Sequence, residues 1–303
     1  MRVLIVASYN KQRFAPFILE QAASLASQGC SIEFWGIEGK GLCGYAKALP
    51  SLKRKIKQWH PDIIHAHYGL SGLLANMQRR VPVVTTYHGS DINVKRVLPF
   101  SKLCMILSRF NIFVSQKTLD IAGPKSRFCL LPCGVDMTEL QMTDKSEARA
   151  SLGFEQDRRY VLFAGAFDNA VKNSPLAKEA VSLLPGVELL ELKGYSRDQV
   201  TLLMCAADAL LLTSFSEGSP QVVKEAMACG CPIVSVDVGD VAETVGGLPY
   251  SYITTRDSRD IAKHIRLAFG SHAKTPGRDR IIALGMDNVS IAKQLISIYS
   301  SIV

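Results

Sequence analysis

The 303-residue sequence lacks any run of about 18 uncharged apolar residues, the length that a membrane-spanning helix requires. We therefore expect no transmembrane helix. The stretch Met1–Ser8 is too short and wrongly flanked for a signal peptide, and it is typical of a first buried strand. Low-complexity tracts and a recognisable internal repeat are also absent. With 48% hydrophobic and 20% charged residues, the composition is that of an ordinary folded protein.

Cysteine motifs with the spacing of a zinc site are lacking as well. The pairs Cys129/Cys133 and Cys229/Cys231 each stand without a matching second pair, so zinc binding is not expected. A chain of this size does not need disulfide bonds. We expect the eight cysteines to be reduced, buried side chains of a cytoplasmic protein. They are Cys30, Cys43, Cys104, Cys129, Cys133, Cys205, Cys229 and Cys231.

Two ligand-binding patterns are also missing. Gly-x-Gly-x-x-Gly does not follow the first apolar run, which argues against a nicotinamide dehydrogenase. Asp-x-Asp occurs nowhere in the chain. His65 and His67 alternate along one predicted strand, but no carboxylate or third ligand accompanies them at a suitable spacing. Packing at a strand end explains these two histidines better than a metal site.

The positive charge is distributed unevenly. The net charge is +8; residues 1–140 hold 18 Lys/Arg against 8 Asp/Glu, and residues 141–303 hold 17 against 19. A basic first half and a near-neutral second half suggest two domains with different partners. The basic segment Lys53–Trp59 could contact an anionic membrane, although a solvated helix face is the commoner explanation. Nucleic-acid binding is not expected, because no known module is visible.

Short apolar runs alternate with helical patterns along the chain, which indicates parallel sheets covered by helices on both faces. The predicted strands are Val3–Ala7, Ser31–Trp35, Ile63–His67, Val83–Tyr87, Ile112–Ser115, Cys129–Pro132, Tyr160–Gly165, Val187–Lys193, Ala209–Thr213, Ile233–Val236 and Tyr252–Thr254. The predicted helices are Pro16–Gln28, Leu52–His60, Gly69–Arg79, Phe100–Phe110, Gln116–Ala122, Pro175–Leu184, Ser196–Ala206, Pro220–Cys229, Ser258–Ala268 and Val289–Tyr299.

The alternation breaks once, in a polar stretch without strand character. We therefore predict a first α/β domain over 1–140, a linker over 141–158 and a second α/β domain over 159–285. Residues 286–303 would form a helix that packs back towards the first domain.

The segment Phe215–Val236 is the most informative part of the sequence. It is typical of a loop, a helix and a buried strand, with Glu217 in the loop and Glu225 eight residues later on the helix. Backbone N–H groups around Gly218–Val222 lie at the start of this helix, where phosphate binds readily. Carboxylates that can bind hydroxyl groups thus lie beside amides that can bind phosphate. This combination predicts a sugar-nucleotide pocket.

This segment, Glu217-Gly-Ser-Pro-Gln-Val-Val-Lys-Glu-Ala-Met-Ala-Cys-Gly, resembles the two-glutamate motif of glycosyltransferase family 4, also called the glycosyltransferases group 1. Further stretches resemble the family in the same order, over about residues 1–245. They are Ile63-Ile-His-Ala-His-Tyr-Gly, Pro82-Val-Val-Thr-Thr-Tyr-His-Gly-Ser-Asp, Leu131-Pro-Cys-Gly-Val-Asp, Phe163-Ala-Gly and Val171-Lys-Asn.

The resemblance implies an α/β GT-B fold, in which two Rossmann-like parallel-sheet domains face a central cleft. The acceptor would bind to the first domain, 1–140, and the nucleotide sugar to the second, 159–285. It implies a retaining glycosyltransferase that takes a hexose-type sugar from a nucleoside-diphosphate sugar without a metal ion. The acceptor would be a glycan, a lipid-linked molecule or a small molecule, in cell-surface polysaccharide or glycolipid synthesis. The cleft would close by a hinge near Asp136. Independently of the resemblance, the cysteines and the basic first half lead us to expect a cytoplasmic enzyme that contacts the inner face of the membrane peripherally.

The resemblance also assigns roles to individual residues. Glu225 would bind the donor ribose, Glu217 and His88 would position the sugar, and Lys172 would neutralise the leaving diphosphate. Each of these residues also has an ordinary alternative role. Glu225 could be a surface glutamate, Glu217 a helix-cap acid, His88 a capping histidine and Lys172 a solvated lysine. Further donor-binding candidates are Gly165, Gly218, Ser219, Pro220, Gln221 and Val222, with Lys193, Gly194 and Tyr195 near the nucleobase. The acceptor-side candidates are Asn10, Tyr68 and Asp91, and Asp91 could equally be a helix N-cap.

The chain departs from the family pattern at two positions. Ser8-Tyr-Asn-Lys-Gln-Arg-Phe stands where a glycine-rich loop is usual, and Ala166 stands where many members carry arginine. The diphosphate would then be held by Lys172 and backbone amides. Two other functions on the same fold stay open: a sugar-nucleotide hydrolase or epimerase, which would turn over without acceptor, and a non-catalytic subunit, which would bind donor weakly or not at all.

Overall fold

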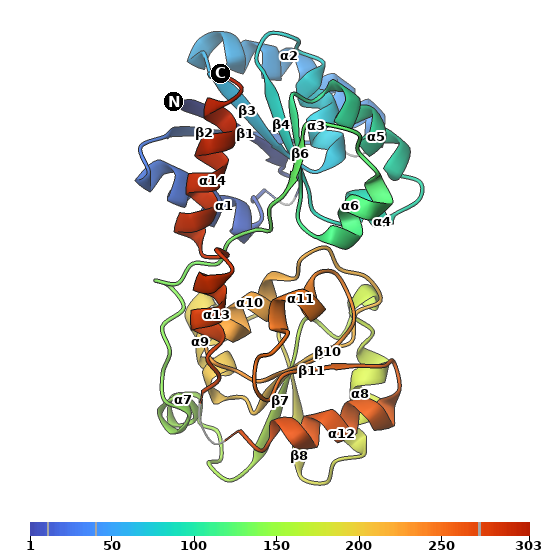
Figure 1. Cartoon of the computed structure of the whole chain (residues 1–303), viewed down its shortest axis with the longest axis vertical. Coiled ribbons are helices and arrows are strands. Elements are labelled where there is room, and N and C mark those ends of the chain that lie inside the picture. The colour runs from blue at the N-terminus through green and yellow to red at the C-terminus, as the bar shows by residue number, and fades with distance from the viewer. Residues whose placement is uncertain (11, 40, 272–273) are drawn as a thin grey trace. The chain divides into compact units, whose positions relative to one another are not determined.

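The computed structural model describes residues 1–10, 12–39, 41–271 and 274–303, without the side chains of 41–43 and 46. Two compact units are present (Figure 1). Unit 1 consists of Met1–Gly134 and Asn288–Val303, and unit 2 consists of Val135–Asp287. Among the described residues, no helix is both long enough and apolar enough to cross a membrane.

Unit 1 contains a parallel sheet of six strands in the order β2-β1-β3-β4-β5-β6. Its central strands are short apolar runs that are buried on both faces, as strands of a covered parallel sheet must be. The strands are β1 Arg2–Ser8, β2 Ser31–Ile37, β3 Ile63–His67, β4 Val83–Tyr87, β5 Phe110–Phe113 and β6 Phe128–Leu130.

Helices cover the sheet of unit 1, and the last helix of the chain, α14, is one of them (Figure 1). Ile291, Leu295 and Tyr299 of α14 are buried in a cluster with α1 and β1. The helices of unit 1 are α1 Pro16–Ser27, α2 Gly41–Trp59, α3 Gly69–Asn76, α4 Ser90–Asn93, α5 Leu98–Leu107, α6 Gln116–Ala122 and α14 Asn288–Ser300.

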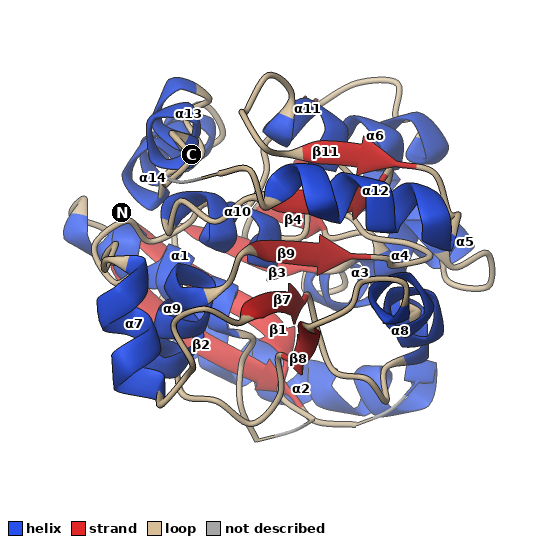
Figure 2. Ribbon diagram, turned by 90° about the horizontal axis from the view of Figure 1, so that it is seen from below, coloured by secondary structure: helices blue, strands red, loops and turns tan. Residues whose placement is uncertain are grey.

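Unit 2 contains a parallel sheet of five strands in the order β11-β10-β9-β7-β8. Its strands are β7 Arg159–Phe163, β8 Val187–Glu191, β9 Ala209–Leu212, β10 Ile233–Val236 and β11 Tyr252–Thr254. Helices pack on both faces of this sheet (Figure 2). They are α7 Lys145–Leu152, the short 3₁₀ helix η1 Ala170–Lys172, α8 Ser174–Ser182, α9 Arg197–Ala206, α10 Gln221–Ala228, α11 Val241–Val245, α12 Ser258–Ala268 and α13 Gly277–Ala283.

The stretch 141–158, expected to be a linker, belongs to unit 2 and contains α7. The buried Asp208 holds it there, because its carboxylate pairs with Lys145 and Arg149 of α7 and with Arg159 of β7 at 2.7–2.8 Å. Burial raises the pKa of Asp208, but these cations and hydrogen bonds outweigh burial and lower it overall. The chain changes unit at Gly134/Val135 and again at Asp287/Asn288.

Candidate functional site

The predicted donor residues lie in loops that follow β7, β8 and β9 of unit 2. All five strands of this sheet are parallel, so these loops leave the same edge of the sheet. That edge is where ligands bind in open α/β sheets. Gly165 and Lys172 follow β7, Lys193–Tyr195 follow β8, and Glu217 follows β9.

Lys172 and Glu217 form an ion pair, with 2.8 Å between Lys172 Nζ and Glu217 Oε1. The side chains are 19% and 17% exposed, so the pair is largely shielded from solvent. Gly165 makes room for it, because a Cβ at this position would lie 2.9–3.1 Å from the aliphatic carbons of Lys172. The structure thus joins three residues that the sequence predicted for one site.

Backbone and side-chain bonds fix the loop after β9 against the loop after β7. Thr213 Oγ1 donates to the carbonyl oxygens of Lys172 and Asn173, and the Phe215 N–H donates to Val171 O at 2.9 Å. Arg256 donates to the carbonyl oxygens of Thr213 and Phe215 at 3.2 Å. These hydrogen bonds therefore hold together the two loops that carry Lys172 and Glu217.

The stretch Gly218–Pro220 leads into α10 and is held from behind by buried groups. Ser219 Oγ donates to the Asp240 carboxylate at 2.5 Å. A side chain at Gly239 would collide with the carbonyl oxygen of Gly218, which explains the glycine. Pro220 is the N-cap of α10 and has no N–H group, so amides for a phosphate must come from the other predicted residues, Gly218, Ser219, Gln221 and Val222.

Glu225 of α10 binds an arginine that the sequence reasoning missed. Arg197 Nη1 lies 2.5 Å from Glu225 Oε1, and the Glu225 side chain is 12% exposed. Arg197 is the first residue of α9, directly after the Ser196 N-cap. Its place just beyond β8 was the available signal, but an arginine at a helix start is usually solvated.

The three residues predicted near the nucleobase form an exposed loop. Lys193 Nζ donates to Asp168 at 2.6 Å, which links this loop to the one after β7. The hydrogen bond and charge of Asp168 raise the pKa of Lys193. Gly194 has φ +81°, a conformation that favours glycine, and Tyr195 is 42% exposed. The Tyr195 ring is therefore accessible to a stacking ligand.

In unit 1, His88 follows β4 and is surrounded by aromatic rings. Its Nε2 lies 3.0 Å from Nδ1 of His67, and its Nδ1 lies 3.6 Å from Sγ of Cys133. The Phe17 and Tyr68 rings lie 4.8 and 4.7 Å away. His67 stacks on His65 at 4.5 Å, and His65 contacts Tyr299 Oη at 2.5 Å. The histidine pair thus packs in the sheet, and no cluster of metal-ligating residues occurs in the described ranges.

Asp91 is the second residue of α4, whose N-cap is Gly89. Its carboxylate accepts the N–H groups of Gly69, His88 and Gly89 at 3.0 Å, and it is 4% exposed. Burial raises its pKa to about 6, although these N–H bonds act in the other direction. The structure thus gives Asp91 a definite local role, which is to hold the loops that carry Tyr68 and His88.

Asn10 and Tyr68 line one hollow of about 440 Å³ at the end of β1. The Asn10 side chain bridges this loop to the next one by two bonds with Gly39, at 3.0 and 2.7 Å. The hollow is lined by Ala7, Ser8, Asn10, Arg13, Phe14, Ala15, Pro16, Ile18 and Tyr68. Two of the three acceptor-side candidates, Asn10 and Tyr68, therefore line the same cavity.

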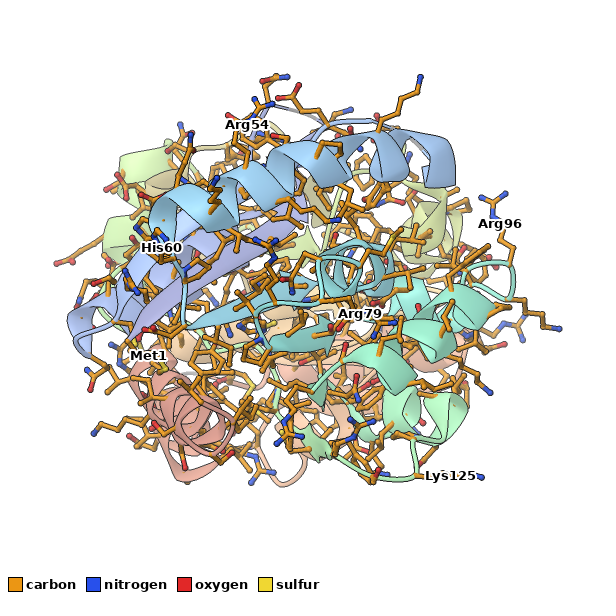
Figure 3. The ribbon with its side chains drawn as sticks, turned by 90° about the horizontal axis from the view of Figure 1, so that it is seen from above. Met1, Arg54, His60, Arg79, Arg96 and Lys125 are labelled. Atoms are coloured by element: carbon orange, nitrogen blue, oxygen red, sulfur yellow. The ribbon has the colours of Figure 1, made fainter. Side chains whose placement is uncertain are left out.

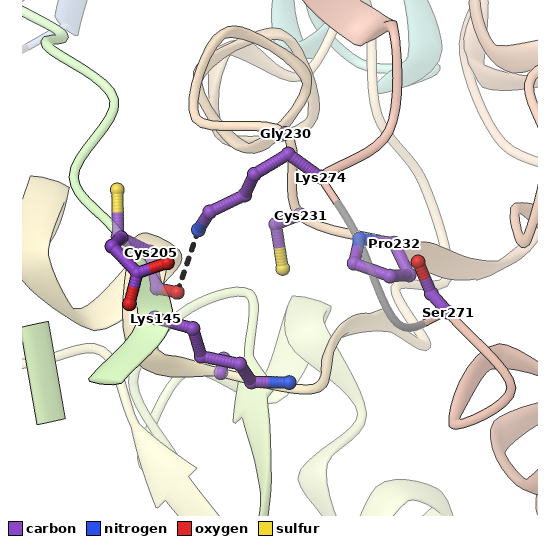
Figure 4. Close-up of a pocket in the computed structure, with 9 residues that line it drawn as sticks. Lys145, Cys205, Gly230, Cys231, Pro232, Ser271 and Lys274 are labelled. Carbon is purple, nitrogen blue, oxygen red and sulfur yellow. Dashed lines mark hydrogen bonds between the residues drawn. The ribbon is translucent and has the colours of Figure 1, made fainter.

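A second, smaller hollow of about 80 Å³ in unit 2 contains none of the predicted residues (Figure 4). Lys274 Nζ donates to the Cys205 carbonyl oxygen there at 2.7 Å. The seven cysteines whose side chains are described form no disulfide; the side chain of Cys43 lies outside the described set. Cys205 is fully buried, so its thiol is shielded from reagents.

Comparison with known proteins assigns the chain. A family model described as "Glycosyltransferase Family 4" matches residues 19–139, and one described as "Glycosyl transferases group 1" matches residues 155–269. The chain belongs to the family 4 glycosyltransferases. The family predicted from the two-glutamate motif is therefore confirmed.

Curated relatives of this family 4 chain are considerably longer. It is 28% identical over 241 residues to a Bacillus subtilis (strain 168) protein named as the teichuronic acid biosynthesis glycosyltransferase TuaC, over 70% of this chain and 62% of that protein. It is 26% identical to a D-inositol 3-phosphate glycosyltransferase of Actinosynnema mirum, over 76% of this chain and 70% of the relative. The chain thus spans about three fifths of the length of TuaC.

Solved structures show the same fold over the whole chain. Sucrose-phosphate synthase from Thermosynechococcus elongatus superposes with a TM-score of 0.83 at 17% identity, over 99% of this chain and 98% of that one. Anabaena Alr3699/HepE, crystallised with UDP, superposes with a TM-score of 0.78 at 18% identity, over 99% and 100%. The predicted GT-B fold of two Rossmann-like parallel-sheet domains is confirmed.

Proposed function

We propose that this chain transfers a hexose-type sugar from a nucleoside-diphosphate sugar to a glycan, lipid-linked or small-molecule acceptor, with retention of the anomeric configuration. The observation that carries the proposal is the Lys172–Glu217 ion pair, 2.8 Å long, at the ligand-binding edge of the unit 2 sheet. A fixed cation serves a phosphate, and a fixed carboxylate accepts bonds from sugar hydroxyls.

On this proposal, unit 2 binds the donor. Lys172 and the amides at the start of α10 hold the diphosphate and stabilise the negative charge that develops when it leaves. Glu225, fixed by Arg197, accepts the ribose hydroxyls, and Tyr195 contacts the nucleobase. This set of groups supports catalysis without a metal ion, because the cation and the amides meet the charge. Anabaena Alr3699/HepE was crystallised with UDP and with UDP-glucose, so uridine nucleotides are the first to test.

Lys172 and Glu217 bind each other in this structure. An incoming donor brings a diphosphate that competes with Glu217 for Lys172, and sugar hydroxyls that replace Lys172 on Glu217. The ion pair therefore holds both side chains where the donor binds. When the donor binds, the Lys172–Glu217 contact is replaced by a Lys172–diphosphate contact and a Glu217–sugar contact. Attack of the acceptor on the face from which the diphosphate departs gives retention. NMR of the product decides this point, since an inverted anomer contradicts it.

Unit 1 would supply the acceptor site. The hollow lined by Asn10 and Tyr68 supports this, as does the position of His88 beyond the end of β4. We further propose a cytoplasmic enzyme of cell-surface polysaccharide or glycolipid synthesis with peripheral contact at an anionic membrane. The basic composition of residues 1–140 and the name of the relative TuaC support this assignment.

The proposal is tested by thermal shift against UDP, GDP, ADP and their common sugar conjugates. A ligand at 100 times its dissociation constant stabilises a protein by about 2.7 kcal/mol, which is readily measured. We expect a shift with one nucleotide family that Glu225→Ala abolishes. Glu188→Ala serves as the matched control, because Glu188 pairs with Arg158 at the opposite end of β8.

Absence of a shift with every nucleotide contradicts donor binding and supports a non-catalytic subunit. Turnover of the donor without any acceptor indicates the hydrolase or epimerase instead. A shift that survives in Glu225→Ala removes Glu225 from the site.

A further inference from the structure

The edge of the unit 1 sheet where β4, β5 and β6 begin carries two adjoining hollows. The first, of about 250 Å³, is lined by four arginines: Arg79, Arg80, Arg109 and Arg127. The second, of about 360 Å³, lies between the ends of α5 and α6 and is lined by Lys102, Met105, Ile106, Lys125 and Arg127, among others. Arg127 belongs to both. We call the surface formed by both hollows the basic face.

Almost no negative charge opposes these cations. Residues 63–135 contain nine Lys/Arg but only two acidic residues, Asp91 and Asp120. Asp91 is buried and bound to backbone amides, and Asp120 accepts a bond from Gln116 on α6. In the part of the chain that the structure describes, Arg79, Arg80 and Arg109 make no ion pair. Their charges are therefore available to a partner.

The basic face is built from ordered backbone. The Gln78 side chain accepts the N–H groups of Arg80 and Val81 at 2.8 and 2.9 Å and donates to Val81 O, which fixes the turn that carries Arg79 and Arg80. Arg127 Nη2 donates to the Ile106 carbonyl oxygen at 3.2 Å. In Figure 3, Arg79 lies near the centre of the view and Lys125 at its rim, with Arg54 of α2 on the opposite rim.

Large apolar side chains stand exposed beside these cations. Ile106 is 69% exposed, and Leu103 and Met77 are each 47% exposed. Leu103 and Ile106 lie on α5, one helical turn apart, next to Lys102. Apolar side chains surrounded by cations are the features of a surface that enters the headgroup region of an anionic bilayer.

We propose that the basic face docks this protein on an anionic phospholipid bilayer. Headgroup phosphates occupy the arginine hollow, and Leu103 and Ile106 enter the boundary between headgroups and acyl chains. This inference rests on the membrane contact included in the proposed function and gives that contact a location. A soluble polyanion fits less well, because it has no use for the exposed apolar side chains and finds no exposed aromatic ring in either hollow for base stacking.

The test is co-sedimentation of the full chain with vesicles of phosphatidylcholine alone or with 30% phosphatidylglycerol, a fraction chosen as roughly that of an anionic membrane. We expect binding only to the anionic vesicles. Each cation near an anionic surface is worth about fivefold in affinity, so Arg79→Gln/Arg80→Gln/Arg109→Gln weakens binding on the order of a hundredfold. The matched control is Lys53→Gln/Arg54→Gln/Lys57→Gln on α2, which removes the same charge and retains most of the binding.

Ile106→Ser separates a bilayer from a soluble polyanion, because the charge is unchanged. We expect several-fold weaker vesicle binding and unchanged retention on heparin. Equal losses in the two triple variants overturn the location, and vesicle binding that Ile106→Ser leaves intact overturns insertion into a bilayer. The nucleotide thermal shift is measured for each variant and should be unchanged, so failure of the donor proposal is seen separately from failure of docking.

Discussion

Lys172 and Glu217 show how single residues bring together a candidate site on a common fold. Asn173 adopts the left-handed conformation, with φ 54° and ψ 52°, and turns the chain from η1 into α8. That turn leaves the Lys172 side chain directed across Gly165 towards Glu217. The motif in the sequence names the two charged residues, whereas the glycine and the asparagine determine that they meet.

The histidines of unit 1 make stability depend on pH. Burial lowers the pKa of His65 to about 3, and burial together with the charges of His65 and His88 lowers that of His67 well below its usual value. Below pH 6.5 these two histidines bind protons in the unfolded chain but not in the folded chain, so the free energy of unfolding falls as pH falls. This stabilisation is complete above pH 6.5 and is lost towards pH 3.

We predict that His65→Gln makes this loss less steep by about 1.4 kcal/mol per pH unit, the contribution of one proton. Urea unfolding between pH 7.5 and 4.5 measures the slope. Thr86→Val is the control, because it removes the 2.7 Å bond to His65 Nε2 but no titrating group, and it should keep the wild-type slope. Asp91, whose pKa is raised to about 6, acts in the opposite direction and cancels between variants. Equal slopes in all three proteins contradict the prediction.

At the scale of elements, α10 is anchored by a buried lysine. Lys224 is 1% exposed, and Asp240, at the start of α11, is 8% exposed. Burial raises the pKa of Asp240, and the charge of Lys224 together with the Ser219 hydrogen bond opposes this shift. Ser219 belongs to the loop that leads into α10, so its hydrogen bond to Asp240 joins that loop to α11, and the charge of Lys224 on α10 acts on the same carboxylate.

We predict that Lys224→Met destabilises unit 2 by about 3–5 kcal/mol, because it removes the buried positive charge that acts on the buried Asp240 carboxylate. Adding Asp240→Asn should restore most of this loss. Chemical denaturation of the two variants measures both effects. A loss below about 1 kcal/mol for Lys224→Met, or a double variant less stable than the single one, indicates that the two groups do not depend on each other.

Elements defined by their own sequence pattern were predictable, and those defined by distant contacts were not. The strands Ile63–His67 and Val83–Tyr87 and the helix Gln116–Ala122 agree residue for residue with the prediction. The helix α13 was missed, because Arg278 holds it by bonds to the carbonyl oxygens of Met137, Leu140 and Ala228. Polar composition alone made 141–158 look like a linker.

The residues of the candidate site likewise fall into those predictable from a sequence motif and those that depend on distant contacts. The family motifs identify Lys172, Glu217 and Glu225 by their spacing in the sequence alone. Arg197 was not predictable, because its contact with Glu225 spans 28 residues and depends on how α9 and α10 pack. Asp91 was predicted to face the acceptor or cap a helix, and only the folded backbone shows three N–H groups converging on it.

For the whole molecule, unit 1 is discontinuous in sequence and depends on α14. Leu295 and Tyr299 of this helix are fully buried, Ser24 Oγ donates to Asn288 O at 2.8 Å, and Tyr299 bonds to His65. Unit 2, in contrast, is one continuous stretch of chain, Val135–Asp287, and contains all the predicted donor residues. The two units should therefore unfold as separate transitions.

We predict that Leu295→Ala lowers the stability of unit 1 by about 2–5 kcal/mol and leaves unit 2 unchanged. In calorimetry, one transition should move to lower temperature while the transition that responds to nucleotide stays in place. The matched control is Leu203→Ala on α9, a fully buried leucine of unit 2, which should move the nucleotide-responsive transition instead. If either substitution moves both transitions together, the units unfold as one cooperative body, and stability is shared between unit 1 and unit 2.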